Sequence, residues 1–310
     1  MNNKVQGNPA LQVDLAGVSL QNPVMTASGT FGYGEEYGGL FDLQRLGAIV
    51  VKATTKTPRM GNPYPRVVET AAGMLSSCGM QNVGVEVFIR EKMPYLRQLG
   101  IPVIVNIAGE SEDDFVFVAN KLSVTEGVSA LEMNVSCPNV QNGGMTFGRD
   151  PATVFRLVRS VKSVSQLPVI CKLTPNVTDI VEIALAAQAA GADAVSLINA
   201  LWGMAIDVET KKPLLGNVTG GLTGPAIKPV ALRMVWQVAQ AVSVPVIGIG
   251  GITTAGDALE FIIAGATAVQ VGTANFFRPK ATLEIIDGIE AYLQNHGYRH
   301  IDELRGSLEV

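Results

Sequence analysis

The sequence predicts an α/β protein of the (β/α)8 barrel class, also called a TIM barrel. Short runs rich in β-branched residues alternate with longer amphipathic segments along the chain, as in successive βα units. Eight such runs occur, and no change of composition between them marks a linker. With 310 residues, 47% of them hydrophobic, the chain can bury a core of barrel size. We therefore expect one domain over residues 1–310.

A small hairpin is expected before the barrel. Residues 11–23, LQVDLAGVSLQNP, alternate between apolar and polar and turn at Ala16 and Gly17. This pattern is typical of a β-hairpin, which would close the bottom of the barrel.

The barrel strands are predicted from the β-branched runs, and helices are expected after each of them. Two clear helical segments are 179–190 and 227–242, and an AGA tripeptide should end two helices before the next strand. A doubly wound open sheet is the alternative arrangement. The predicted strands are 24–28, 48–54, 102–108, 130–136, 168–174, 194–200, 245–251 and 268–274.

Composition excludes several classes of partner. The net charge is −4 and the basic residues are scattered, which argues against nucleic acid. No run approaches the roughly 18 consecutive apolar residues of a membrane span, and the N-terminus lacks the apolar core of a signal peptide. The cysteines Cys78, Cys137 and Cys171 are too dispersed for a disulfide framework or a metal site. We expect a cytoplasmic protein with no membrane contact.

Polar residues stand late in five of the apolar runs. Buried polar groups cost free energy unless they are bonded, so five at one face of a barrel favour a polar, planar ligand held over its mouth. The alternative is that the asparagines bond to loop backbone and the lysines extend into solvent. The five are Lys52, Asn106, Asn134, Lys172 and Asn199.

Glycines end the last two predicted strands, in GIGG at 248–251 and VGTA at 271–274. They let backbone N–H groups approach an anion, and helix N-termini that follow favour negative charge. The loops after strands seven and eight are the usual phosphate site of such barrels. A phosphate-bearing ligand is therefore expected, although the glycines could serve tight turns alone.

Cys137 directly follows the fourth predicted strand. Pro138 fixes the chain after it, and the glycine-rich stretch 141–148 could act as a lid. A thiol there could serve as a base or a nucleophile, with an unperturbed pKa of about 8.5. The two histidines, His296 and His300, lie near the C-terminus, which argues against histidine-activated acyl transfer. A packed structural cysteine is the alternative; we assign that role to Cys171 and none to Cys78.

The chain resembles the dihydroorotate dehydrogenases, and among them the catalytic subunit of the bacterial NAD-linked class 1B form. The resemblance covers about residues 11–279 and implies a barrel that uses FMN to oxidise dihydroorotate to orotate in pyrimidine synthesis. It rests on the motifs ASGTFGYGEEY (27–37), VKATT (51–55), GNPYPRVVET (61–70), EMNVSCPN (132–139), KLTPNVTDI (172–180), GGLTGPAIKPVALR (220–233), GIGGI (248–252) and VGTANFFRP (271–279).

The resemblance also implies roles for individual residues. Lys172 would lie near the pyrimidine end of the flavin, where a cation stabilises the negative charge that reduction brings. Cys137 would be the general base. The residues implied around FMN are Ser28, Lys52, Ala53, Asn106, Asn134, Lys172, Ile198, Gly224, Gly250, Gly251, Gly272 and Thr273. Those implied around the substrate are Lys52, Ser76, Ser77, Cys78, Gly79, Met80, Asn134, Asn199 and Ala200.

Two positions depart from the family pattern, and both belong to the substrate set. The family usually has an asparagine where this chain has Ser76, and a hydroxyl residue where it has Ala200. A related FMN barrel enzyme that acts on another dihydropyrimidine or cyclic amide therefore stays open as an alternative. A phosphate-binding barrel without redox chemistry is a third hypothesis, and such a protein would purify colourless.

The electron acceptor follows less directly from the sequence. Three dispersed cysteines cannot hold an iron–sulfur cluster that needs four ligands, and the lack of an N-terminal membrane extension disfavours quinone. GIGG lacks the GxGxxG spacing of a dinucleotide site. Fumarate or a second protein must then take the electrons. The resemblance implies a homodimer joined to an electron-transfer subunit that carries FAD and a [2Fe–2S] cluster, a heterotetramer with NAD as final acceptor.

Overall fold

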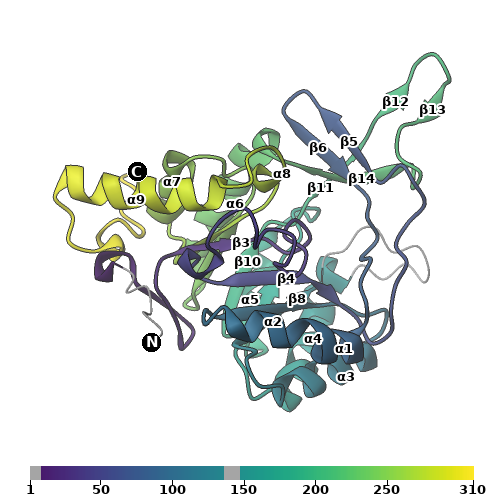
Figure 1. Ribbon diagram of the computed structural model, residues 1–310, viewed down its shortest axis with the longest axis horizontal. Helices are drawn as coiled ribbons and strands as arrows, with labels where there is room; N and C mark the ends of the chain where they lie inside the picture. Colours follow the sequence, from purple (N-terminus) through teal and green to yellow (C-terminus); the bar gives the residue numbers. More distant parts are fainter. Residues whose placement is uncertain (1–7, 136–146) are drawn as a thin grey trace.

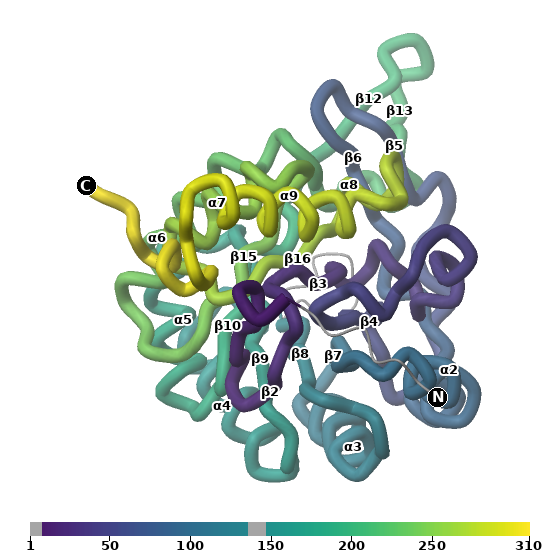
Figure 2. Tube along the Cα trace, turned by 60° about the vertical axis from the view of Figure 1, so that its left-hand side comes forward, coloured from purple at the N-terminus to yellow at the C-terminus, as the bar shows by residue number. Residues whose placement is uncertain are grey.

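A computed structural model describes residues 8–135 and 147–310 of the protein. In these ranges, eight parallel strands form one sheet in the order β3-β16-β15-β10-β9-β8-β7-β4. Figure 2 shows these strands at the centre, with helices such as α3, α5, α7 and α9 around them. The strands are β3 (Val24–Thr26), β4 (Ile49–Thr54), β7 (Val103–Ile107), β8 (Ala130–Asn134), β9 (Val169–Lys172), β10 (Ala194–Leu197), β15 (Val246–Ile249) and β16 (Ala268–Val271).

The two edge strands of this sheet meet and close the barrel. Met25 of β3 forms a parallel bridge with Ala48, which directly precedes β4. The hydroxyl of Thr26 accepts a hydrogen bond from the backbone N–H of Val50 at 2.9 Å. The predicted (β/α)8 barrel is thus confirmed, and the open-sheet alternative is wrong.

Helices connect most of the strands, as predicted (Figure 1). The predicted segments 179–190 and 227–242 are α5 and α6. The AGA tripeptides follow α5 and α7, where Gly191 and Gly265 have φ of 95° and 116°. The helices are α1 (Val85–Val87), α2 (Met93–Gln98), α3 (Glu112–Ser123), α4 (Pro151–Val164), α5 (Ile180–Ala189), α6 (Lys228–Ala241), α7 (Ala255–Ile263), α8 (Ala274–Phe277) and α9 (Ala281–His296).

The connection from β3 to β4 departs from the prediction that a helix follows each strand. It consists of turns and one short 3-10 helix, η2 (Leu43–Arg45). Gly29, Gly32 and Gly34 in this segment all have positive φ, which a right-handed helix cannot contain. The expected helix is therefore wrong at this one connection.

The predicted N-terminal hairpin is confirmed. Strands β1 (Val13–Leu15) and β2 (Val18–Leu20) pair antiparallel, and the turn residues Ala16 and Gly17 have φ of 52° and 86°. The hairpin leads directly into β3, so it lies at the N-terminal ends of the strands, opposite the carboxyl ends where barrel active sites lie.

A second sheet, which the sequence pattern did not predict, stands beside the barrel. Its antiparallel order is β11-β14-β6-β5, and a two-stranded ribbon of β12 and β13 extends beyond it. Figure 1 shows these strands projecting from one side of the barrel. Their bounds are β5 (Val67–Thr70), β6 (Gly73–Ser76), β11 (Leu201–Met204), β12 (Ile206–Asp207), β13 (Lys212–Pro213) and β14 (Thr219–Thr223).

Candidate active site

Two adjoining cavities lie at the carboxyl ends of the barrel strands. Their volumes, which include space open to solvent, are about 530 Å³ and 1020 Å³. They are continuous with each other because five residues line both: Ser28, Thr30, Asn199, Ala200 and Thr223.

The smaller cavity brings together the predicted phosphate loops. Its wall includes the glycines that follow β15 and β16, together with the first residues of the loop that precedes α7. Of the residues predicted to contact FMN, eight line it: Ser28, Lys172, Ile198, Gly224, Gly250, Gly251, Gly272 and Thr273.

The larger cavity brings together the predicted substrate residues and the remaining predicted FMN residues. Its wall includes Lys52, Ala53, Asn106, Asn134, Ser76, Cys78, Gly79, Met80, Asn199 and Ala200. Of the predicted FMN and substrate residues, all of which lie in the described ranges, Ser77 alone lines neither cavity. Its side chain is buried, and its hydroxyl donates a hydrogen bond to the carbonyl oxygen of Arg66 at 3.4 Å.

Gly251 shows why a glycine is needed in the loop after β15. Its φ is +71°, which disfavours any residue with a side chain. A Cβ at this position would lie 2.9 Å from the carbonyl oxygen of Gly224 and 2.8 Å from the Cβ of Lys228. The loop therefore offers bare backbone to the cavity, as a phosphate site requires.

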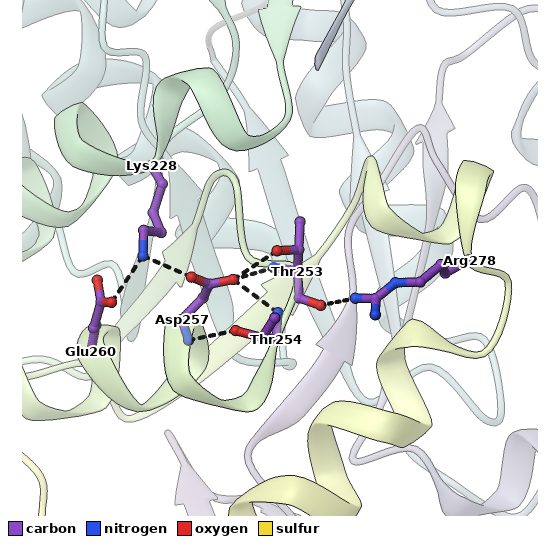
Figure 3. A network of polar contacts seen from close by, with 6 residues as sticks. All are labelled: Lys228, Thr253, Thr254, Asp257, Glu260 and Arg278. Carbon is purple, nitrogen blue, oxygen red and sulfur yellow. Dashed lines mark hydrogen bonds and ion pairs between the residues drawn. The ribbon is translucent and has the colours of Figure 1, made fainter. Parts of the chain in front are cut away.

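A network of ion pairs and hydrogen bonds holds the loop after β15 (Figure 3). The carboxylate of Asp257 accepts hydrogen bonds from the backbone N–H of Thr253 at 2.9 Å, from its hydroxyl at 2.8 Å and from the N–H of Thr254 at 2.9 Å. Lys228 donates to Asp257 at 2.7 Å and to Glu260 at 2.9 Å. Arg278 donates to the carbonyl oxygen of Thr253. Thr253 and Thr254 are thus held by α7, and Lys228 connects α7 to α6.

The network also shifts the pKa values of its members. Burial pushes the pKa of Asp257 upward, but the hydrogen bonds from Lys228, Thr253 and Thr254 outweigh burial and hold that pKa well below its usual range. Burial lowers the pKa of Lys228, but Asp257 and Glu260 outweigh it and leave that pKa raised. Both groups therefore stay charged at neutral pH.

Lys52 presents a cation to the larger cavity. Within residues 8–135 and 147–310, no carboxylate forms an ion pair with its ammonium group. The ammonium nitrogen lies 5.8 Å from the centre of the Tyr33 ring, a cation–π contact. A cation that faces a cavity in this way suits an anionic group of a ligand.

The loop at residues 76–82 is held by side chains outside the predicted set. Arg66 donates hydrogen bonds to the carbonyl oxygen of Met60 and the amide oxygen of Gln81, both at 2.8 Å. Asn82 donates to the carbonyl oxygen of Met80 at 2.9 Å and to Thr55 at 2.7 Å. The loop at 76–82, which forms part of the wall of the larger cavity, is thus held in place by side chains of the protein itself.

Asn176 supports the opposite wall. It donates to the carbonyl oxygen of Ala200 at 3.0 Å and accepts from the N–H of Trp202 at 3.1 Å. Sequence reasoning gave this residue no role, although it lies in the KLTPNVTDI motif.

A buried polar network below the cavities was also missed. The carboxylate of Glu132, on β8, accepts hydrogen bonds from Asn106, Ser196 and Gln270. Lys172 lies 3.6 Å from the same carboxylate and donates to Ser28 at 3.0 Å. The sequence shows these polar residues within apolar runs. Only the pairing of strands β7, β8, β9, β10 and β16 shows that their side chains meet.

Two of the three cysteines, Cys78 and Cys171, lie in the described ranges. Cys137 lies outside the described residues. Cys171 is fully buried, and burial, with a smaller contribution from the charge of Glu132, raises the pKa of its thiol to about 12. Cys171 is thus the packed thiol that the sequence predicted. Cys78 is exposed and lines the larger cavity, with its sulfur 3.6 Å from the hydroxyl of Ser76.

Other classes of site find no support in the described ranges. No group of three or more His, Cys, Asp or Glu side chains there could hold a metal ion. No helix in the same ranges is both long and apolar enough to cross a bilayer. Fold and site together define a (β/α)8 barrel enzyme whose polar cavities open at the carboxyl ends of the strands.

Comparison with known proteins places the chain more narrowly. A family model for dihydroorotate dehydrogenase matches residues 10–293. The chain is 57% identical over 302 residues to the dihydroorotate dehydrogenase B (NAD(+)) catalytic subunit of Geotalea uraniireducens, covering 97% of this chain and 99% of that protein. It is 57% identical to the protein of the same name from Alkaliphilus metalliredigens, over 96% and 98% of the two chains. The chain belongs to the dihydroorotate dehydrogenase family.

Proposed function

We propose that the chain binds FMN and uses it to oxidise dihydroorotate to orotate in pyrimidine synthesis. The observation that carries the proposal is the pair of joined cavities. One has glycine loops after β15 and β16, and the other has the ammonium group of Lys52, which forms no ion pair with a carboxylate of the described residues. A phosphate-bearing cofactor fits the first cavity, and a small anionic substrate fits the second. The family of the chain supports the same chemistry.

The residues of the cavity walls fit FMN. Bare backbone at Gly250 and Gly251 and at Gly272 and Thr273 would hold its phosphate. Asn106 is fully buried, yet its amide oxygen has no hydrogen-bond partner among the described residues, which leaves an acceptor for a ligand N–H group. When bound, FMN supplies the two-electron acceptor of the reaction.

The chain itself would hold the substrate and move its proton. Lys52 would bind the substrate carboxylate, and the amides of Asn134 and Asn199 would bind its polar edges. Cys137, three residues after Asn134 in the sequence, would remove a proton from the carbon next to the one that loses hydride.

The direct test is anaerobic reduction of the purified protein. We expect a yellow protein with one non-covalent FMN that dihydroorotate bleaches rapidly and dihydrouracil bleaches slowly, because dihydrouracil has no carboxylate for Lys52. A colourless protein, or equal rates with both compounds, would contradict the proposal.

A second candidate is oxidation of another dihydropyrimidine or cyclic amide by the same cofactor. It is favoured by Ser76 and Ala200, the two departures from the family pattern, because both line the larger cavity. The comparison of dihydroorotate with dihydrouracil decides between the two candidates.

We further propose that electrons leave through a partner. The similar proteins are named as catalytic subunits of an NAD(+) enzyme, which implies a second subunit in those proteins. For this chain we propose a homodimer joined to a subunit with FAD and a [2Fe–2S] cluster. The isolated chain should then reduce its flavin with dihydroorotate but reduce NAD poorly, and efficient NAD reduction by the isolated chain would contradict the partner.

A further inference from the structure

The side chain of Glu132 is fully buried in the barrel and contacts one wall residue of each cavity. Its Oε1 accepts a hydrogen bond from the Nδ2 of Asn106 at 2.6 Å, and Asn106 lines the larger cavity. The same oxygen lies 3.6 Å from the Nζ of Lys172, which lines the smaller cavity. One buried carboxylate thus connects the two sites.

The partners of Glu132 are all donors. Its Oε2 accepts from the Nε2 of Gln270 at 2.7 Å and from the hydroxyl of Ser196 at 3.0 Å. A carboxylate surrounded only by donors acts as an acceptor and fixes the amides beside it with their nitrogens inward. The amide oxygens of Asn106 and Gln270 accordingly point away from Glu132, and neither has a partner among the described residues.

Glu132 also carries the charge opposite to that of Lys172. The ammonium group of Lys172 is held between this carboxylate and the hydroxyl of Ser28, 3.0 Å away, and the residue is 4% exposed. Because both groups are buried away from water, their charges are poorly screened, and the negative charge of Glu132 offsets part of the positive field of Lys172 at the cavity.

Stability alone does not explain this arrangement. A buried ion pair is often no more stabilising than apolar residues of the same volume, because removal of two charges from water costs free energy. The barrel core around Glu132 is otherwise apolar. The contacts of the carboxylate with Asn106 and Lys172 therefore point to a functional role.

We propose that Glu132 is a positioning residue, which holds Asn106 and Lys172 in place for the flavin and offsets part of the positive charge of Lys172. This inference rests on the proposed flavin chemistry. Since a reduced cofactor carries more negative charge than an oxidised one, a nearby cation favours reduction and a nearby anion opposes it. Glu132 should therefore lower the reduction potential of the bound cofactor.

The test is the potential of FMN bound to the Glu132→Gln variant, measured by equilibration with a reference dye. Glutamine keeps the shape of the side chain, and the amide of Gln270 can rotate to accept from its new N–H group. We expect the equilibrium ratio of reduced to oxidised FMN at a fixed potential to rise about tenfold, which equals about 30 mV for a two-electron couple.

Ser196→Ala is the matched control, because it removes one donor to Glu132 but keeps the charge. It should lower the melting temperature and leave the ratio of reduced to oxidised FMN within about twofold of the parent. If Glu132→Gln also lowers only the melting temperature, the carboxylate is structural and the inference is wrong.

Two further measurements keep the test decisive. If Glu132→Gln does not fold, Glu132→Asp replaces it. The shorter side chain moves the charge away from Lys172, so the ratio of reduced to oxidised FMN should rise by less than tenfold. An unchanged ratio would overturn the inference.

The FMN content of the parent is measured first. A parent without flavin overturns the proposed function, whereas a parent with flavin and unshifted variants overturns only the role of Glu132.

Discussion

The smaller cavity is walled by strand ends and glycine loops of the barrel itself, whereas the larger cavity takes much of its wall from segments outside the βα repeat. At the smaller cavity, Gly251 lines the wall and is held near the ion network of Lys228 and Asp257. At the larger cavity, side chains and the loop at 76–82 line the wall. Changes at the glycine loops and the ion network should therefore act on cofactor binding, and changes at Cys137 or the loop at 76–82 on substrate chemistry.

The largest effect is expected for Cys137→Ala, on the substrate side. Proton transfer by a positioned group typically contributes about 10²–10⁴-fold, so flavin reduction by dihydroorotate should slow by about that factor. Orotate binding should survive, because Lys52, Asn134 and Asn199 remain. Stopped-flow measurement of anaerobic flavin bleaching gives the rate.

Two variants complete this test. Cys137→Ser should show activity only at higher pH, because a hydroxyl loses its proton less readily than a thiol. Cys171→Ala removes a buried thiol that stays protonated, and its rate should stay within a few-fold of the parent. A rate for Cys137→Ala within a few-fold of the parent would mean that the base lies elsewhere.

A smaller effect is expected for Gly272→Val, on the cofactor side. A Cβ at this position would lie 3.3 Å from the Cβ of Ala27 and 3.6 Å from Thr30, so valine would fill the cavity between them. Crowding of this kind costs about 1–3 kcal/mol, which predicts about 10–100-fold weaker FMN binding by fluorescence titration. Gly39→Val is the control, because a Cβ at Gly39 meets no atom within 4 Å. If Gly272→Val binds FMN as tightly as the parent, the phosphate does not bind at this loop.

The sequence predicted the two sides of the site unequally. The barrel strands were evident from β-branched runs, and the loops that line the smaller cavity from glycines at their ends. The predicted strands ran too long, however. β10 ends at Leu197, because Asn199 and Ala200 leave the sheet to line the cavities. Sequence pattern does not separate the last residue of a strand from the first residue of a site.

The second sheet had no comparable signal. Strand β14 is TGGLT, with two glycines, and β5 is partly exposed, so neither reads as a strand by composition. Their pairing depends on β6, which contacts β14 across nearly 150 residues of chain. Long-range pairing of this kind, like the meeting of Glu132 with Gln270, follows from register and not from local pattern.

The ion network behind the smaller cavity gives a third, pH-dependent prediction. Asp257→Asn removes the charge that binds Lys228, Thr253 and Thr254, and hydrogen bonds to charged groups contribute about 1.5–3 kcal/mol. We expect about tenfold weaker FMN binding and a lower melting temperature at neutral pH. Glu260→Gln, which removes the more exposed partner of Lys228, should have a smaller effect.

The pH dependence follows from the depressed pKa of Asp257. The unfolded chain has an aspartate pKa of about 3.9, and the folded value is lower, so the stabilisation is complete above about pH 4 and is lost as the pH falls further. Thermal unfolding across pH checks this. The melting temperatures of the parent and Asp257→Asn should approach each other progressively as the pH falls below about 4, and a constant difference would exclude ionised Asp257 as the cause.

The smallest effect is expected for Arg66→Lys, which loosens the larger cavity alone. Arg66 fixes the substrate loop through Met60, Asn62 and Gln81, and a lysine cannot reach several acceptors in the same geometry. Loss of one hydrogen bond at about 1 kcal/mol should raise KM for dihydroorotate about fivefold, with FMN affinity unchanged. Arg59→Lys is the control, because the side chain of Arg59 pairs with Glu110 instead of this loop. If Arg66→Lys weakens FMN binding as much as it raises KM, the two cavities do not act separately, because the loop at 76–82 would then support the cofactor as well as the substrate.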